Sequence, residues 1–216
     1  MKVQQETPQI SEWRGRFGRD YTDRNPQDTS SLDALYQRNY GVTRTTLNQR
    51  FLQPVPPSAR ILEVGCNIGN QLVLLRQLGY ANLHGIEIQS YALEKARMQL
   101  PDAVFKEASA FAIPFPDEYF DLVFTSGVLI HIAPSDLPRA LDEIHRVAKT
   151  WIWGLEYYAP ATTEIMYRGH TGLLWKSDFA QVYLRRFADF ELVREERLRY
   201  LENENSDTMF LLRRES

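Results

Sequence analysis

The chain has 216 residues, of which 44% are hydrophobic and 25% are charged. This length fits one domain with a substantial core and leaves little room for a second independent domain. The formal net charge of −3 argues against a broad phosphate-binding surface, so we expect no nucleic-acid partner. Arginines gather between Arg185 and Arg199, but Glu195 and Glu196 lie among them, which indicates a solvated face.

The cysteines and histidines of the sequence limit which metal sites and disulfides the protein can form. Cys66 is the single cysteine, which excludes an internal disulfide and a cysteine-rich zinc site. The sequence has no HxxxH motif and no carboxylate cluster at ligand spacing, so we expect no metal. The start MKVQQETPQI lacks the apolar core of a signal peptide, and no apolar run approaches a membrane span of about 20 residues. We therefore expect a cytoplasmic protein with no membrane partner.

The first 57 residues form a segment of their own. Residues 1–30 are polar but carry Trp13, Phe17 and Tyr21, so this part orders over a ligand as a lid, packs on the surface or stays disordered. Apolar residues at helical spacing follow between Leu32 and Leu52, and a proline-rich stretch ends that region. We predict an N-terminal extension and helical cap over 1–57 and a cofactor-binding domain over 58–216, within one structural domain.

The stretch ILEVGCNIGNQLVLLRQLGYANLHGIEI, residues 61–88, has the order of a nucleoside-binding βαβ unit. A buried strand leads to a turn with Gly65 and Gly69, an amphipathic helix follows, and a second strand ends in Glu87. Glu87 lies 87 − 69 = 18 residues after the last turn glycine. That is close to the roughly 20 residues expected for an acid that accepts hydrogen bonds from ribose hydroxyls.

The middle of this turn indicates which nucleoside binds. The three positions of a dinucleotide GxGxxG motif are Gly65, Asn67 and Asn70, so two side chains stand where a pyrophosphate would lie. S-adenosylmethionine has no phosphate, and Glu63 near its ammonium and backbone NH groups near its carboxylate would be complementary. Cys66 lies in the same turn, either as a small residue whose backbone matters or as a reactive nucleophile.

Strands and helices alternate through the rest of the chain. Ser90 is a plausible cap for a helix that Pro101 closes, and the end of the chain, ELVREERLRYL followed by DTMFLLRR, favours a hairpin. The predicted fold is an α/β, doubly wound seven-stranded sheet. The further predicted elements are strands at 103–106, 120–126 and 151–158, and helices from about 135 and over 178–187.

With Glu63, Gly65, Gly69, Glu87 and FDLVFTSGVLIHI in place, the chain resembles the class I S-adenosylmethionine-dependent methyltransferases over roughly residues 58–214. The resemblance implies a Rossmann-like sheet of order 3-2-1-4-5-7-6 with only the seventh strand antiparallel. It also implies S-adenosyl-L-methionine as cofactor and S-adenosyl-L-homocysteine as product. The chain is similar, too, to the pseudaminic acid biosynthesis-associated methylases, through FGRDYTDRN, LYQRNYGVTRT, VGCNIGN, SGVLIHI, YRGH and LLWKSDF.

Two positions depart from the common pattern of that class. Asn67 stands where many members have a third glycine, and Ser109 where many have an aspartate near the adenine. Asn tolerates positive φ better than most residues, so we expect the turn to survive. The full cofactor-binding set that we predict is Glu63, Gly65, Cys66, Asn67, Gly69, Asn70, Glu87, Ile88, Ser109, Ala110, Phe111, Ser126 and Gly127.

Methyl transfer from a sulfonium needs an aligned nucleophile and one base. In a doubly wound sheet both come from loops beyond the carboxyl ends of the strands. His131 in SGVLIHIAP is either that base or a packing residue, and GLEYYAP and YRGHTG supply further polar side chains. We predict His131, Glu156 and His170 as catalytic residues, and Tyr21, Tyr157, Tyr158 and Arg168 as substrate-binding residues, with core or surface packing as the alternative.

The sequence therefore predicts an enzyme that transfers a methyl group from S-adenosylmethionine to an O or N atom of a small polar metabolite. A nonulosonic, pseudaminic-type sugar acid or its nucleotide conjugate is the acceptor that the narrower resemblance implies. Two alternatives stay open: a non-catalytic protein that binds the cofactor or its product, and an NAD-dependent oxidoreductase. The oligomeric state is not predicted.

Overall fold

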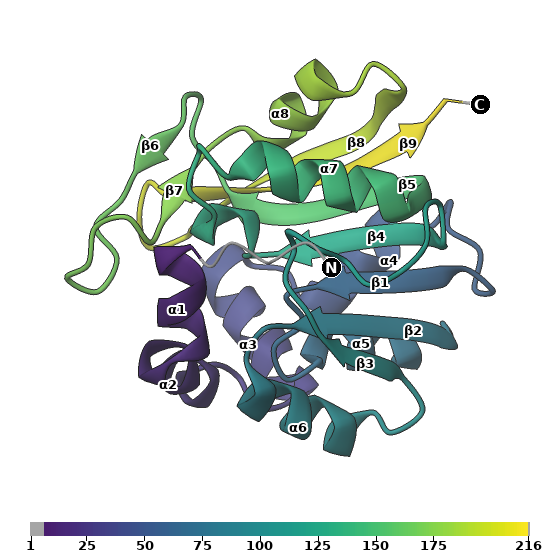
Figure 1. Cartoon of the computed structure of the whole chain (residues 1–216), viewed down its shortest axis with the longest axis horizontal. Coiled ribbons are helices and arrows are strands. Elements are labelled where there is room, and N and C mark those ends of the chain that lie inside the picture. Colours follow the sequence, from purple (N-terminus) through teal and green to yellow (C-terminus); the bar gives the residue numbers. More distant parts are fainter. Residues whose placement is uncertain (1–6, 216) are drawn as a thin grey trace.

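A computed structural model describes residues 7–215. Its centre is a seven-stranded sheet of order β3-β2-β1-β4-β5-β9-β8 (Figure 1). Strand β9 runs antiparallel to both neighbours, and the other neighbouring strands pair in parallel. The strands are β1 (Arg60–Val64), β2 (Asn82–Glu87), β3 (Val104–Glu107), β4 (Phe120–Ser126), β5 (Ala148–Tyr157), β8 (Phe190–Arg199) and β9 (Ser206–Arg214).

This topology confirms the predicted sheet, because β8 and β9 are its sixth and seventh strands. The labels differ because β6 (Thr163–Glu164) and β7 (Trp175–Lys176) form a separate two-stranded ladder in the connection before α8. The central strands are apolar on both faces, as parallel strands covered by helices must be. In β1, for example, Ile61, Leu62 and Val64 are at most 1% exposed.

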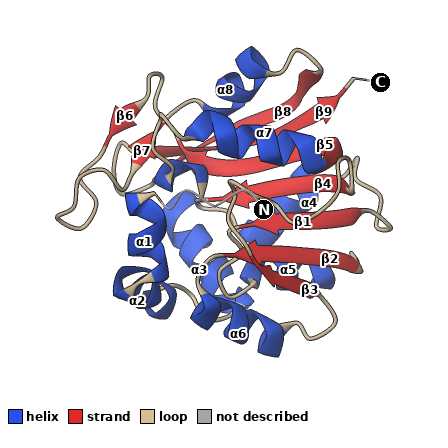
Figure 2. Ribbon diagram, viewed as in Figure 1, coloured by secondary structure: helices blue, strands red, loops and turns tan. Residues whose placement is uncertain are grey.

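Helices cover both faces of the sheet (Figure 2). On one face, α7 and α8 pack onto a core that includes Leu62, Val123 and Ile152; on the other, α3 to α6 pack onto a second core with Ile61, Phe124 and Trp153. The helices are α1 (Pro8–Arg14), α2 (Arg16–Arg24), α3 (Thr29–Tyr40), α4 (Arg44–Phe51), α5 (Asn70–Gln77), α6 (Ser90–Gln99), α7 (Leu137–Val147) and α8 (Phe179–Arg186), with a short 3-10 helix η1 (Leu129–His131).

The segment before the first strand is helical from residue 8 onward, and its first two helices lie beside the edge of the sheet where the parallel strands end (Figure 1). The side-chain amide of Gln89, just after β2, donates to the carbonyls of Trp13, Arg14 and Gly15 at 3.2, 2.9 and 3.2 Å. Of the three predicted alternatives for this segment, the described part is therefore ordered and packed. Residues 1–6 lie outside the described residues.

Several predicted boundaries move. Ser90 was expected to cap α6, but the cap is Gln89, whose side chain accepts from the NH of Tyr91, and Ser90 is the first helical residue. Strand β5 begins at Ala148 because that residue already pairs with Phe120 of β4. Among the described helices, none is long and apolar enough to cross a membrane.

Candidate active site

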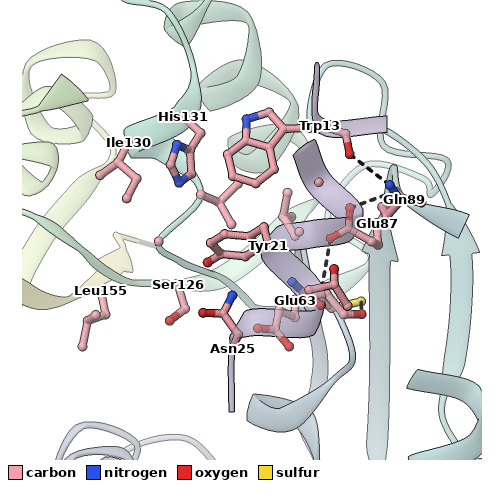
Figure 3. Close-up of a pocket in the computed structure, with 18 of the residues that line it drawn as sticks. Trp13, Tyr21, Asn25, Glu63, Glu87, Gln89, Ser126, Ile130, His131 and Leu155 are labelled. Atoms are coloured by element: carbon pink, nitrogen blue, oxygen red, sulfur yellow. Dashed lines mark hydrogen bonds between the residues drawn. The ribbon is translucent and has the colours of Figure 1, made fainter. Parts of the chain in front are cut away.

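A cavity of about 510 Å³ lies at the carboxyl ends of β1, β2, β4 and β5. This volume falls in the range of small-molecule sites. Its walls combine the loops after these strands with side chains of α1, α2 and α3. Figure 3 shows Trp13 and Tyr21 of the first two helices beside His131, and Glu63 and Glu87 line the same cavity.

The turn after β1 has the strained backbone that its sequence predicts. Gly65 and Gly69 have φ of 71° and 81°, and Asn67 also has a positive φ of 47°. A Cβ at Gly65 would lie 2.7 Å from a methyl group of Val128. This position therefore requires glycine both for its positive φ and for the lack of space. The NH groups of Gly65 and Cys66 donate to the carbonyl of Ile86, so these two donors are already used within the protein.

Glu87 sits at the end of β2 and fixes the turn. One carboxylate oxygen accepts from the NH of Asn67 at 2.9 Å, and the other from the NH groups of Ile88 and Gln89 at 2.7 and 3.0 Å. Burial nevertheless raises the pKa of Glu87 above its ordinary value. A carboxylate offers about four acceptor positions, so one remains for a ribose hydroxyl.

Glu63 tests whether the residues present fit S-adenosylmethionine. Its carboxylate is 3% exposed, and within residues 7–215 its Oε2 has no hydrogen-bond partner. The side-chain oxygens of Asn67, Asn70 and Gln71 are buried and unpaired in the same sense. Burial raises the pKa of Glu63 well above its ordinary range, which the nearby Arg44 only partly opposes. Four acceptors without donors fit a ligand that brings an ammonium group.

The predicted adenine contacts line the same cavity. Ile88, Ser109, Ala110 and Phe111 all form part of its wall, but the Ser109 hydroxyl accepts from the NH of Phe111 at 3.2 Å and so stabilises its own turn. Cys66 is 3% exposed, and burial raises the pKa of its thiol well above the ordinary value. A thiol held neutral is a poor nucleophile, so Cys66 acts as a small spacer.

His131 faces the cavity from η1. Its Nδ1 lies 2.7 Å from the carbonyl oxygen of Leu173, which makes Nδ1 the protonated nitrogen and leaves a lone pair on Nε2. Burial lowers the pKa of the ring to about 4, so the imidazole is neutral at physiological pH. The rings of Trp13 and Tyr167 pack against it at centroid distances of 4.4 and 5.4 Å. His131 therefore has the tautomer and charge of a proton acceptor.

Glu156 does not occupy the place predicted for a catalytic residue. Side chains alternate along β5, so Leu155 and Tyr157 line the cavity while Glu156 points to the opposite face of the sheet. It is 1% exposed, its two oxygens accept from the NH groups of Val128 and Ile130 at 3.2 and 3.4 Å, and burial raises its pKa to about 7. Glu156 positions the loop that carries His131.

Some of the remaining predicted residues line the cavity and others lie outside it. Tyr21, Tyr157 and Arg168 line the cavity, with Arg168 exposed at its rim. Tyr158 lies outside it, with the guanidinium of Arg197 over its ring at 3.0 Å from the centroid. His170 is also outside: it is exposed and packs edge-on against Phe17. Tyr158 and His170 thus lie apart from the other predicted residues, and their roles remain predictions; near His170 the chain reverses after Arg168, whose φ is positive at 52°.

Sequence reasoning missed several cavity residues. Tyr36, Tyr40, Tyr200 and Asp207 form one side of the wall. Behind them Arg44 is fully buried and donates to Asn48, Tyr36 and Ser126 at 2.8, 2.8 and 3.1 Å. These residues come from α3, α4 and the last hairpin, which are distant in sequence, so no local motif could indicate them.

The sheet order, the strained turn after β1 and the acid at the end of β2 define the class I methyltransferase fold. Residues 62–150 match the family described as "Methyltransferase domain". This match covers less than half of the chain; together with the fold it supports a methyltransferase domain that uses S-adenosyl-L-methionine as cofactor.

Two curated relatives support this assignment. An uncharacterized methyltransferase of Synechocystis sp. is 33% identical over 95 residues, which cover 44% of this chain and 44% of that protein. Malonyl-(acyl-carrier protein) O-methyltransferase of Halorhodospira halophila is 28% identical over 186 residues, 76% of this chain and 60% of that protein. The chain thus spans less than two thirds of the length of these relatives.

A solved structure shares the fold along the whole chain. The 1,6-didemethyltoxoflavin-N1-methyltransferase of Burkholderia thailandensis, solved with 1,6-didemethyltoxoflavin and S-adenosylhomocysteine bound, superposes with a TM-score of 0.73. The match covers 100% of this chain and 94% of that one at 14% identity. At this identity the likeness establishes the fold and nothing about the acceptor.

Proposed function

We propose that the protein transfers a methyl group from S-adenosylmethionine to an oxygen or nitrogen atom of a small polar metabolite. One observation carries the proposal: a single cavity holds the unpaired Glu63, the ribose-type acid Glu87 and the neutral His131. The acids suit the methyl donor, and the histidine suits an acceptor that must lose a proton.

The chain's own residues would share the work as follows. When bound, the cofactor supplies a methyl group that its sulfonium already activates. Glu63 holds the ammonium end, Glu87 accepts from a ribose hydroxyl, and His131 takes the acceptor's proton on Nε2. Glu156 keeps His131 in place through the backbone of η1. Alignment and one base suffice for this reaction, so a metal ligand set is not needed.

We also propose that α1 and α2 act as a lid, and that the chain divides functionally near residue 58. Trp13 and Tyr21 close the cavity above His131, and their rings pack at a centroid distance of 5.1 Å. Gln89 attaches the corner between the two helices to the loop after β2. Asp23 of α2 also accepts from Tyr91 and Lys95 at 2.7 and 2.9 Å, and Gln9 of α1 donates to the carbonyl of Gly172 at 3.1 Å. These contacts involve side chains and no strand pairing of the main sheet, so the lid can open without unfolding the sheet.

For the acceptor, a nonulosonic sugar acid or its nucleotide conjugate is our first choice. The support is the motif resemblance noted above, together with Arg168 on the cavity rim, where a guanidinium can bind a carboxylate with two hydrogen bonds. Sugar hydroxyls would meet the tyrosines of the wall.

Two measurements test the function. Calorimetry should show binding of S-adenosylmethionine and S-adenosylhomocysteine and far weaker binding of NAD. Preferential binding of NAD would refute the proposal. A homocysteine-release assay on free and nucleotide-linked nonulosonic acids should then reveal turnover. Tight cofactor binding without turnover on any hydroxyl or amine acceptor would favour the alternative, a non-catalytic cofactor-binding protein. His170→Ala serves as a control that should retain turnover, because this side chain lies outside the cavity.

A further inference from the structure

The cavity contains a third carboxylate, on a strand that is distant in sequence from the turn after β1. Asp207 of β9 lies directly opposite Tyr157 of β5 in the antiparallel register and is 2% exposed. Its Oδ2 accepts from the hydroxyls of Tyr40 and Tyr200 at 2.5 and 3.4 Å. Among residues 7–215, Asp207 forms no ion pair, so its only described side-chain partners are neutral.

Two cations of the protein lie near Asp207 without forming a described ion pair with it. Lys176 and Arg44 are close enough to favour the ionised carboxylate. Neither forms a described ion pair with Asp207: the ammonium of Lys176 donates to Asn205 at 2.5 Å and lies 5.9 Å from the centroid of the Tyr157 ring. Arg44 donates to Asn48, Tyr36 and Ser126, and its Nη2 has no described partner. Burial accordingly raises the pKa of Asp207 to about 6. A buried carboxylate without a cation is costly, which makes a cationic ligand its natural complement.

Three tyrosine rings surround this carboxylate. Tyr40, Tyr157 and Tyr200 all line the cavity, and the rings of Tyr40 and Tyr200 meet at a centroid distance of 4.8 Å and an angle of 65°. The faces of such rings attract cations. We refer to Tyr40, Tyr157, Tyr200 and Asp207 as the amine box.

The amine box is continuous with the donor end of the cavity. The ring of Tyr40 packs on that of Tyr36 at 5.3 Å, and Arg44 donates to both Tyr36 and Ser126, at the end of β4. On its other side, Tyr157 is near Tyr167, which packs on His131. A small molecule can therefore contact the box and His131 at once.

We propose that the methyl acceptor carries a protonated or quaternary amine and that this group binds in the amine box. This inference rests on the proposed function and adds the charge class of its substrate. Because an ammonium has no lone pair, the methylated atom is a different O or N atom of the same molecule, on the His131 side. There the new bond to carbon forms as the carbon–sulfur bond breaks, and the proton of that atom passes to His131. A zwitterionic metabolite would add its carboxylate at Arg168.

Simple probes test the box without knowledge of the acceptor. In protein saturated with S-adenosylhomocysteine, calorimetry or ligand-observed NMR compares benzylammonium with the neutral benzyl alcohol, which has similar size. We expect benzylammonium to bind about 10- to 100-fold more tightly, the range of one hydrogen bond to a charged group. Asp207→Asn should abolish this preference while the affinity for S-adenosylhomocysteine stays within about twofold. Asp142→Asn, a matched change at an exposed surface ion pair with Arg186, should retain it.

The outcomes separate the two proposals. If S-adenosylhomocysteine does not bind, the proposed function fails. If it binds but the two probes bind equally, or if Asp207→Asn keeps the preference, only the amine box is refuted. Equal losses of cofactor and probe binding in Asp207→Asn would assign Asp207 to the donor site and also refute the box. Should Asp207→Asn fail to fold by circular dichroism, Tyr200→Leu removes one ring and one hydroxyl. It should then lower the preference by about threefold or more, and an unchanged preference would count against the box.

Discussion

Replacement of Glu87 by Gln is the sharpest test of the donor site, because the carboxylate serves both the protein and the ligand. Its two oxygens accept three backbone NH groups, two on Oε1 and one on Oε2. Glutamine has only one acceptor oxygen. At best this oxygen keeps the two hydrogen bonds from the NH groups of Ile88 and Gln89, and the side-chain NH₂ group then faces the NH of Asn67, which is also a donor. That exchange removes one charge-assisted hydrogen bond and leaves a buried donor unpaired.

The expected loss is about 1.5–3 kcal/mol, the usual value of a hydrogen bond to a charged group. It should appear as roughly a 10- to 100-fold weaker affinity for S-adenosylhomocysteine in calorimetry, because the turn and the ribose acceptor are both disturbed. Urea unfolding of the free protein should measure the part of this free-energy loss that comes from the turn itself. Glu107→Gln is the matched control: Glu107 pairs with Glu87 across β2 and β3 but is exposed and does not line the cavity. Unchanged affinity in Glu87→Gln, or an equal loss in the control, would refute the assignment.

Three further predictions concern buried titrating groups. Burial raises the pKa of Glu63 well above its ordinary value of 4.5, so binding of an ammonium should release its proton. Affinity for the cofactor should therefore rise with pH above that ordinary value, and Glu63→Gln should flatten this slope in calorimetry. His131→Asn should lower kcat about 100-fold or more while the affinity for the cofactor changes by less than about threefold. Because burial lowers the pKa of His131 to about 4, the rate of the wild-type protein should not fall near pH 6.5. A titration of the rate near that pH would contradict the proposed environment of the ring. The folded-state pKa of Asp207, about 6, exceeds its ordinary 3.8, so its contribution to stability is present below pH 4 and lost as pH rises through 6. Asp207→Asn should therefore stabilise the protein by up to about 3 kcal/mol at pH 8 but not at pH 4 in urea unfolding, and equal effects at both pH values would contradict this.

The donor half of the site could be predicted from the sequence because it is local. A strand, a glycine turn and an acid 18 residues after the last turn glycine (87 − 69) fix their own geometry, and the positive φ of Asn67 confirms the expected turn. The order of the sheet is confirmed as well, and the match of residues 62–150 to a methyltransferase domain supports the predicted class. The assignment of individual catalytic residues remains a prediction.

The acceptor half could not be predicted in the same way. Alternation along β5 separates Glu156 from Leu155 and Tyr157, but the sequence does not say which face of the strand meets the cavity. The contact between Tyr40 and Asp207 joins residues 167 apart, so it follows from packing of α3 on the final hairpin. Such contacts carry no spacing that a single sequence reveals.

This difference in sequence distance has a consequence for how such a protein can evolve. The predicted donor-binding residues lie in one stretch from Glu63 to Gly127, whereas the proposed amine box draws on Tyr40 near one end of the chain and on Tyr200 and Asp207 near the other. Changes in α3 or in the last hairpin can therefore alter which acceptor is chosen without touching the residues that hold the methyl donor. A fold divided in this way can keep one cofactor while its lineage explores many substrates.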